Sequence, residues 1–401
     1  MNNTFDRGLL NWIDSQQKTM QDLLIQWSSI NTHSLNSAGL KILSQHIVEA
    51  FSVFNEHITF LPLPPYQPAS LNGKTITHEL APAISIQKRP KALKQILFVC
   101  HFDTVYSLKT SFDVIKNKNV LNGPGVADAK GGIVVMLKAL EAFERSPVAK
   151  NIGWRIILNT DEEIGSPGSL QLWKRFAPKF DLCFIFEPSL PNGDLVSSRK
   201  GSANLTLTVH GRSAHAGRNP EDGRNAIQAL AECVYKIEGL SHEDCKINFG
   251  YWEGGGPVNV VTEHALTQFN IRFSQISDYK NFIKEVTKIT KQISQKREVK
   301  VILSGQVTAE AKPLIPETLK LLKMVKECGK ELGFNVSWRE TAGVCDGNRL
   351  QSLGLPTIDS LGVQGNNLHS SREFVKLDSL VQRTKLTTLL LLKLAQEGKK
   401  L

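Results

Sequence analysis

The stretch QILFVCHFDTV (residues 95–105) combines an uninterrupted apolar run with a histidine and an aspartate placed directly after it. A continuous apolar run of this length is typical of a strand buried on both faces of a parallel sheet. The same design returns in WRIILNTDEEIGSPGS (154–169) and in DLCFIFEPS (181–189). Helical patterns, among them 130–145, alternate with these runs over the first 190 residues. We therefore predict an α/β fold with a mainly parallel sheet flanked by helices.

Chemically active side chains follow these runs at the points where the predicted strands end. His101 follows the first run and Glu187 the third. The second run is followed by the adjacent pair Glu162 and Glu163. Because ligands bind beyond the carboxyl ends of parallel strands, we expect these side chains to gather at one edge of the sheet.

Two further candidates lie outside the runs. Asp128 precedes a helical pattern within GPGVADAKGG (123–132), where glycines let the backbone approach a cluster closely. His369 lies in LHSSREFV (368–375). Two histidines and three carboxylates suit a pair of divalent ions that share one carboxylate, and one glutamate of the adjacent pair is left over as a base. Such a set can hydrolyse an amide with metal-activated water.

Asp103 stands two positions after His101, so at a strand end both side chains face the same way. We interpret this pair as a metal-bound imidazole that a neighbouring carboxylate orients.

The pattern changes near Ser197 and returns near Glu310. Between these points the order is strand, helix, strand, strand, helix, strand, which predicts a ferredoxin-like α+β domain inserted into the first domain. The expected boundaries are 1–196 for the first part of the catalytic domain, 197–308 for the inserted domain, and 309–401 for the second part of the catalytic domain.

Composition excludes several classes of protein. The formal net charge is +10, but the basic residues are scattered and no nucleic-acid-binding motif occurs, so a nucleic-acid binder would rest on net charge alone. No apolar run approaches the roughly 20 residues needed to cross a bilayer, and the N-terminus lacks the pattern of a signal peptide. Six cysteines include no CxxC pair. We expect a cytoplasmic enzyme with no membrane partner and no nucleic-acid partner.

Taken together, the motifs resemble those of the acetylornithine deacetylase, succinyl-diaminopimelate desuccinylase and glutamate carboxypeptidase metallohydrolases, and most of all the carboxypeptidase G type. The resemblance covers nearly the whole chain. The matching motifs, in order, are HFDTV (101–105), GPGVADAKGG (123–132), NTDEEIGSPGS (159–169), FEPS (186–189), HGRSAHAG (210–217), TAGVCDGN (341–348) and LGVQGNNLHS (361–370).

This resemblance implies a zinc exopeptidase-like catalytic domain that binds two divalent metal ions. Zinc suits the mixed ligands best, although cobalt or manganese would fit the same site. One ion would be held by His101, Asp128 and Glu187. The other would be held by Asp128, Glu163 and His369, so that Asp128 bridges the two.

The resemblance also implies the remaining roles. Glu162 would be the general base, and Asp103 would orient His101. His215, in the inserted lid and dimerisation domain, would reach the active site of the partner subunit in a homodimer and stabilise the oxyanion. Arg272 and Asn259 would hold the carboxylate of the substrate.

Backbone near Gly343 would assist in holding that carboxylate. The planar guanidinium of Arg272 is well suited to the role, because its shape fits a carboxylate.

One departure from the carboxypeptidase G pattern concerns the segment after FEPS. That pattern has a basic residue shortly after FEP, whereas SLPNGDLVSS (189–198) contains none before Arg199. A preference for glutamate is therefore not implied.

We predict a metallo-carboxypeptidase that cleaves the amide bond to a C-terminal or N-acylated amino acid with a free carboxylate. An N-acyl amino-acid deacylase of the acetylornithine deacetylase kind is the nearest alternative. A metal-free binding protein on the same scaffold should have lost Glu162 or a ligand, and this sequence retains them all. A serine hydrolase is not supported, because GRSAH (211–215) is not a G-x-S-x-G elbow.

Overall fold

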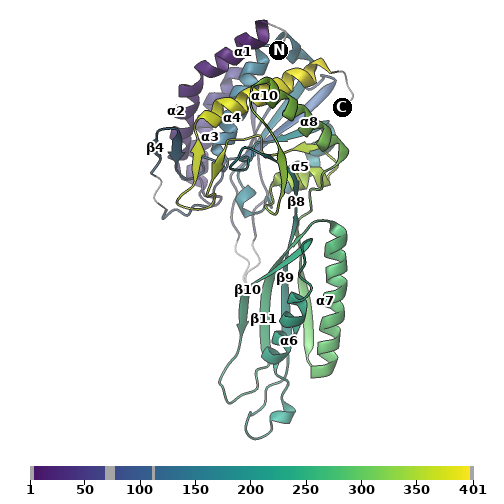
Figure 1. Ribbon diagram of the computed structural model, residues 1–401. Coiled ribbons are helices and arrows are strands. Elements are labelled where there is room, and N and C mark those ends of the chain that lie inside the picture. Colours follow the sequence, from purple (N-terminus) through teal and green to yellow (C-terminus); the bar gives the residue numbers. More distant parts are fainter. Residues whose placement is uncertain (1–3, 68–76, 111–112, 398–401) are drawn as a thin grey trace. The chain divides into compact units, whose positions relative to one another are not determined.

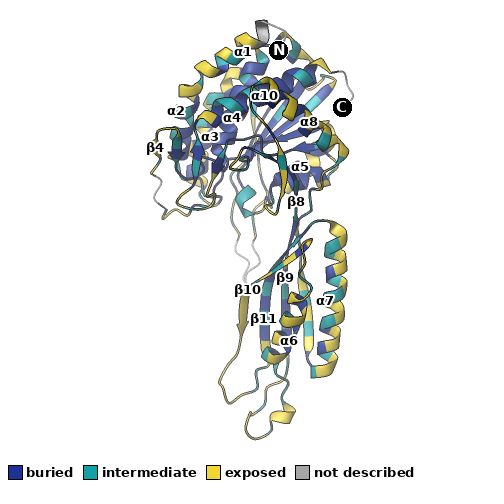
Figure 2. Ribbon diagram, viewed as in Figure 1, coloured by how far each residue is buried: buried dark blue, intermediate teal, exposed yellow. Residues whose placement is uncertain are grey.

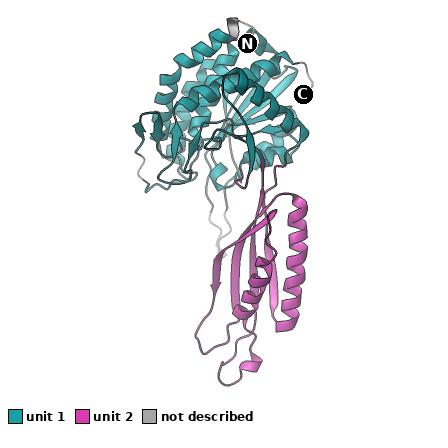
Figure 3. Ribbon diagram, viewed as in Figure 1, with its two compact units in different colours: residues 1–197, 314–340, 345–401 teal, residues 198–313, 341–344 magenta. Residues whose placement is uncertain are grey.

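The computed structural model describes residues 4–67, 77–110 and 113–397, which fall into two compact units (Figures 1 and 3). Unit 1 comprises residues 1–197, 314–340 and 345–401, and unit 2 comprises residues 198–313 and 341–344. Unit 2 thus runs past the boundary expected at 308 and also takes in a short segment from later in the chain. Within the described ranges, no helix has the length and apolar character needed to cross a membrane.

The centre of unit 1 is a six-stranded sheet in the order β1-β2-β6-β3-β7-β14. The pairs β3–β6, β3–β7 and β7–β14 are parallel, while β1 and β2 form an antiparallel edge. The predicted mainly parallel sheet is confirmed. The strands are β1 (Ile58–Leu61), β2 (Ala83–Lys88), β3 (Lys94–His101), β6 (Ile152–Asn159), β7 (Leu182–Ile185) and β14 (Thr357–Ile358).

Helices cover both faces of this sheet, which is why its strands are apolar at successive positions (Figures 1 and 2). Ile96 and Phe98 of β3 belong to a large core with one set of helices, whereas Leu97 and Val99 belong to a second core. The first set is α1 (Thr4–Ser15), α2 (Gln17–Ser28), α3 (Ser37–Phe51), α4 (Lys130–Glu144), α8 (Pro316–Glu331) and α10 (Asp378–Gln396). The second set is α5 (Leu170–Phe176) and α9 (Asp346–Ser352).

Helix α4 lies unusually close to the end of β7. A Cβ on Gly132 would meet the backbone oxygen of Phe186 at 2.0 Å, so only glycine allows this approach. The contact brings the start of α4, and with it Asp128, beside the segment that carries Glu187.

A small four-stranded sheet, in the order β15-β16-β5-β4, was not anticipated. Its strands are only two or three residues long, so their sequences carry no periodic signal. They are β4 (Ile115–Asn117), β5 (Val120–Asn122), β15 (Gly365–Asn366) and β16 (Phe374–Lys376). Because β16 pairs with β5, the loop that contains His369 is tied to the loop that contains Asp128. Strand β14 of the central sheet is equally short, with Thr357 and Ile358 paired to β7.

Unit 2 contains an antiparallel sheet in the order β10-β11-β9-β12. Alternate residues of β9, including Leu205, Leu207 and Val209, pack against the two helices, which gives this strand its half-buried pattern. The observed order of strands and helices confirms the ferredoxin-like prediction. The elements are β9 (Gly201–His210), α6 (Ala226–Glu238), β10 (Cys245–Gly254), β11 (His264–Phe273), α7 (Ile276–Arg297) and β12 (Lys300–Ala309). A separate two-stranded sheet joins β8 (Leu195–Arg199) and β13 (Trp338–Thr341).

Candidate metal centre

The structure brings the five predicted metal ligands together in two groups. His101, Asp128 and Glu187 form one group, and Asp128, Glu163 and His369 form the other. Within each group the ligand atoms all lie within 4.8 Å of one another. His101 ends β3, while Glu163 and Glu187 follow β6 and β7, so the edge formed by the parallel strands supplies three of the five. The other two come from the loops that the small sheet ties together.

Asp128 faces both groups with different oxygen atoms. Its Oδ1 lies 3.2 Å from Nε2 of His101, and its Oδ2 lies 3.3 Å from Nε2 of His369. Glu187 and Glu163 complete the groups at 3.6 Å and 3.2 Å from the same two histidine nitrogens. Ligand bonds of about 2.0–2.1 Å around a tetrahedral zinc ion place the ligand atoms roughly 3.4 Å apart. The donor set and its spacing therefore fit two divalent ions that share Asp128.

Asp103 connects His101 to the turn that carries the glutamate pair. Nδ1 of His101 lies 3.1 Å from the backbone oxygen of Asp103 and 3.3 Å from its Oδ1. The same buried carboxylate accepts hydrogen bonds from the backbone N–H groups of Glu162 and Glu163, at 3.3 and 3.2 Å, and from the Ser34 hydroxyl at 2.7 Å. One carboxylate therefore fixes the orientation of the imidazole and the position of the turn.

The two glutamates experience different surroundings. Burial raises the pKa of Glu162 well above its ordinary value, and the nearby charges of His101 and Glu187 also act on it. Burial, and after it the negative charge of Asp128, raises the pKa of Glu163 to about 7. Divalent ions at the centre would oppose both shifts, because they favour ionised carboxylates.

Helix α9, which is distant in sequence from the glutamate pair, is hydrogen-bonded to the turn that carries this pair. The Ser166 hydroxyl donates to Oδ1 of Asp346 at 2.5 Å, and the Trp173 indole N–H donates to the same atom at 3.1 Å. Arg349 donates to the backbone oxygen of Gly165 at 2.7 Å. Sequence reasoning used the TAGVCDGN motif only for Gly343 and missed Asp346, although an acid within a matched motif was a usable signal.

Glu373 is a second buried acid that sequence reasoning missed, and it lies inside the quoted LHSSREFV motif. It is 1% exposed, and its carboxylate accepts backbone hydrogen bonds from Gly125, Ala127 and Asp128 at 3.0, 2.9 and 3.0 Å. It also accepts a hydrogen bond of 2.5 Å from the Tyr106 hydroxyl. Glu373 therefore clamps the loop that carries the shared ligand to the loop that carries His369.

The predicted substrate-binding residues belong to unit 2 and occur in two places. Arg272, near the end of β11, is half-buried, and its guanidinium donates to the backbone oxygen of Ala342 at 3.4 Å. Gly343 is the next residue, and its backbone oxygen accepts a hydrogen bond of 3.2 Å from Arg199. Arg272 and Gly343 therefore lie close together, as the role predicted for both of them would require.

His215 and Asn259 form the other place. The backbone oxygen of Asn259 accepts a hydrogen bond of 3.0 Å from the N–H of Ala216, and His215 forms an isolated bridge with Val260. Both side chains are exposed, and their loops adjoin His264 at the start of β11. Eight residue steps along that strand, about 27 Å, separate His264 from Arg272. Within one chain, His215 and Asn259 therefore lie far from Arg272.

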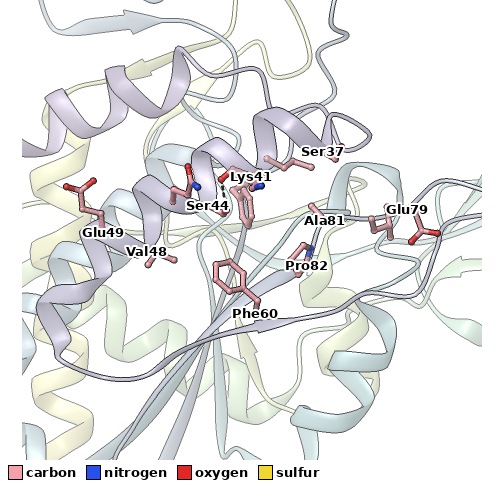
Figure 4. A pocket seen from close by; sticks show the side chains of 13 residues that line it. Ser37, Lys41, Ser44, Val48, Glu49, Phe60, Glu79, Ala81 and Pro82 are labelled. Atoms are coloured by element: carbon pink, nitrogen blue, oxygen red, sulfur yellow. Dashed lines mark hydrogen bonds between the residues drawn. The ribbon is translucent and has the colours of Figure 1, made fainter.

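A wide apolar pocket of about 760 Å³ adjoins the centre without containing a candidate ligand (Figure 4). Residues of α3, such as Val48, line one side, and Phe60 of β1 with Ala81 and Pro82 lines the other. Phe102, between His101 and Asp103, contributes to its wall. This pocket is distinct from the two metal-ligand groups.

The chain is similar to several known proteins. A family model described as peptidase family M20/M25/M40 matches residues 97–393. Carboxypeptidase G2 of Pseudomonas sp. (strain RS-16) is 29% identical over 304 residues, covering 72% of this chain and 71% of that protein. Succinyl-diaminopimelate desuccinylase of Pseudoalteromonas translucida is 28% identical over 290 residues, covering 67% and 74% of the two chains. A tripeptidase of Staphylococcus aureus has a similar fold, with a TM-score of 0.77, 17% identity, and coverage of 95% and 99%.

The Glu373 clamp predicts that Glu373→Gln weakens metal binding. The amide would place an N–H₂ group against backbone N–H donors, so the loop of Asp128 would lose part of its anchor. Losses of this kind cost about 10–100-fold in metal affinity, which competition with a fluorescent chelator measures. Tyr106→Phe is the matched control, because it keeps the carboxylate and its three backbone bonds. Equal affinities in Glu373→Gln and the unchanged protein would contradict the clamp.

Proposed function

The chain belongs to peptidase family M20/M25/M40 and is a metal-dependent hydrolase of amide bonds, and on this premise we propose that it releases a C-terminal or N-acylated amino acid with two zinc ions bound. The observation that carries the proposal is the carboxylate of Asp128, whose two oxygens face two different histidines. Five side chains would then supply six ligand bonds to the two ions. Zinc is favoured by the mixture of imidazole and carboxylate ligands.

Glu162 is the proposed general base. Bound divalent ions supply an acidified water and polarise the carbonyl of the amide. Glu162 takes a proton from the attacking water and later gives it to the leaving amine. Support for this role comes from its position: Asp103 fixes its backbone, and the charges of His101 and Glu187 reach its carboxylate. Glu163, fixed by the same Asp103, is directed to His369 instead.

Arg272 is the proposed partner of the substrate's free carboxylate. Its half-buried guanidinium lies beside the backbone of 342–343, which offers further polar groups. In addition, burial lowers the pKa of Arg272, because its charge has lost part of its hydration. A carboxylate ligand would restore a favourable environment for this charge.

His215 and Asn259 are proposed to act on the active site of a partner subunit. Support comes from the length of β11: about 27 Å separates Arg272 from His264, and the loops of His215 and Asn259 adjoin His264 in the same chain. A single small substrate cannot touch both ends of this strand. If all these residues serve one substrate, two of them come from a second chain, and the active enzyme is a homodimer.

A deacylase acting on N-acyl amino acids is the second candidate. It is favoured by the similarity to a succinyl-diaminopimelate desuccinylase, which is nearly as strong in identity as the similarity to a carboxypeptidase. Turnover of a panel of N-acyl amino acids and dipeptides by zinc-loaded and cobalt-loaded protein distinguishes the two.

Glu162→Gln and Glu163→Gln should fail in different ways. Glu162→Gln keeps both ions but lacks the base, so kcat on the best substrate of the panel should fall by about 10²–10⁴-fold with little change in KM. Glu163→Gln should instead lose one ion, which metal analysis of the purified protein measures. Near-normal turnover by Glu162→Gln would remove the proposed base, and full metal occupancy in Glu163→Gln would remove the proposed ligand.

Arg272→Ala and amidation of the substrate's carboxylate should have overlapping effects. Each alone should lower kcat/KM by at least about tenfold, because either change leaves a charged partner unpaired. Together they should cost little more than one alone, since both remove the same contact. Independent, multiplying losses would show that Arg272 has a structural role.

Mixing two inactive variants tests the shared site. In a heterodimer of His215→Ala and Glu162→Gln, one site contains an intact Glu162 from one chain and an intact His215 from the other. Activity should therefore return after subunit exchange. Absence of recovery, with exchange demonstrated by differently tagged chains, would place His215 in the site of its own chain.

A further inference from the structure

Unit 1 contains a second, cationic pocket on the face of the central sheet that α5 covers. This pocket of about 410 Å³ is lined by residues of β1, β2, β3 and β6 and by the segment 175–180. It forms where helix cover stops: Ile157 of β6 lies in the apolar core under α5, but Arg155, two positions earlier on the same face, lines the pocket. None of the candidate metal ligands contributes to it.

Three cations converge there on one aromatic ring. Arg155, Arg175 and Lys179 lie over the ring of Phe176, with 4.7, 5.0 and 5.8 Å between each charged group and the ring centroid. Among the described residues, no acid lines the pocket. The adjacent acid, Asp181, accepts a hydrogen bond of 2.7 Å from the backbone N–H of Gln95. The pocket therefore concentrates positive charge without a carboxylate in its lining.

Arg155 is held in place rather than free to turn into solvent. It is half-buried, and its guanidinium donates to the Ser85 hydroxyl at 2.7 Å and to the side-chain oxygen of Gln87. Burial lowers its pKa, and the charge of Arg175 lowers it further. Two guanidinium groups thus repel each other in a hollow of the surface, an arrangement that an anion between them would stabilise.

The dipole of helix α5 accounts for only part of this cluster. Arg175 lies in the last turn of α5, where a cation stabilises the helix dipole. That effect does not apply to Arg155, which belongs to a strand on the opposite wall. Lys174, one residue before Arg175, is equally exposed and basic but does not line the pocket.

We propose that this pocket binds a phosphate dianion, either as inorganic phosphate or as the phosphoryl group of a small metabolite. Three cations match the double negative charge of phosphate, whereas a single carboxylate would be satisfied by one guanidinium. The side-chain N–H₂ of Gln87 and the hydroxyl of Thr59 also line the pocket and can donate to phosphate oxygens. The volume leaves room for an organic group beside Phe180.

The test is calorimetric titration of the metal-loaded protein with inorganic phosphate, adenosine monophosphate and adenosine. The paired variant Arg175→Gln/Lys179→Gln should weaken phosphate binding by at least about tenfold, since two charged contacts are lost. Lys174→Gln is the matched control and should bind as the unchanged protein does. All substituted side chains are exposed, and thermal melting checks that both variants fold.

The three ligands identify the source of the phosphoryl group. Tighter binding of the monophosphate than of inorganic phosphate, with no binding of adenosine, would indicate a metabolite, and the reverse order would indicate free phosphate. Phosphate bound by the metal ions would be lost on chelation but equal in the paired variant and the control. That result, or no phosphate binding at all, would overturn the proposal, and neither result bears on the proposed hydrolytic activity.

Discussion

The carboxylate of Asp128 is the group on which the candidate site depends, because among the described residues it alone belongs to both groups of candidate ligands. Sharing one anion brings two clusters of charge within a few ångströms, where unpaired carboxylates would repel one another. The parallel strands place His101, Glu163 and Glu187 at one edge of the sheet. Gly132 allows α4 to pack closely enough to bring Asp128 beside them. The irregular loop of His369 then closes the arrangement.

Three further buried acids hold the segments of the candidate ligands in place. Asp103, Asp346 and Glu373 are all buried, and each accepts hydrogen bonds from the segments that carry the candidate ligands. A buried carboxylate is costly unless its oxygens are satisfied. Backbone N–H groups donate to Asp103 and Glu373, while side-chain donors such as Ser166 and Trp173 satisfy Asp346. The hydrogen bonds that stabilise these buried charges also fix the positions of the loops, and a metal site needs such fixed loops before an ion binds.

The sequence predicted the sheet, the inserted domain and all five candidate ligands, because each of these leaves a local signature. Ile96–Leu97–Phe98–Val99 must face two cores, and that requirement is visible as a continuous apolar run. Asp346 and Glu373 were not assigned, since their partners are distant in the chain and leave no pattern around the acid. The small sheet was missed for a related reason: pairs such as Phe374 with Asn122 arise from tertiary proximity, not from periodicity. The separation of Arg272 from Asn259 likewise becomes visible only when the strand between them is laid out.

The ten residues of β11 carry a consequence of their own. If two chains complete each other's sites, the length of this strand sets how far the loops of His215 and Asn259 extend from their own chain toward the partner's site. Inserting two residues would preserve which side chains face the helices, because the alternation of a strand has a period of two. The reach would nevertheless grow by about 6.8 Å, more than a catalytic contact tolerates. Natural variants of this family would then keep the strand's length even where they freely change its residues.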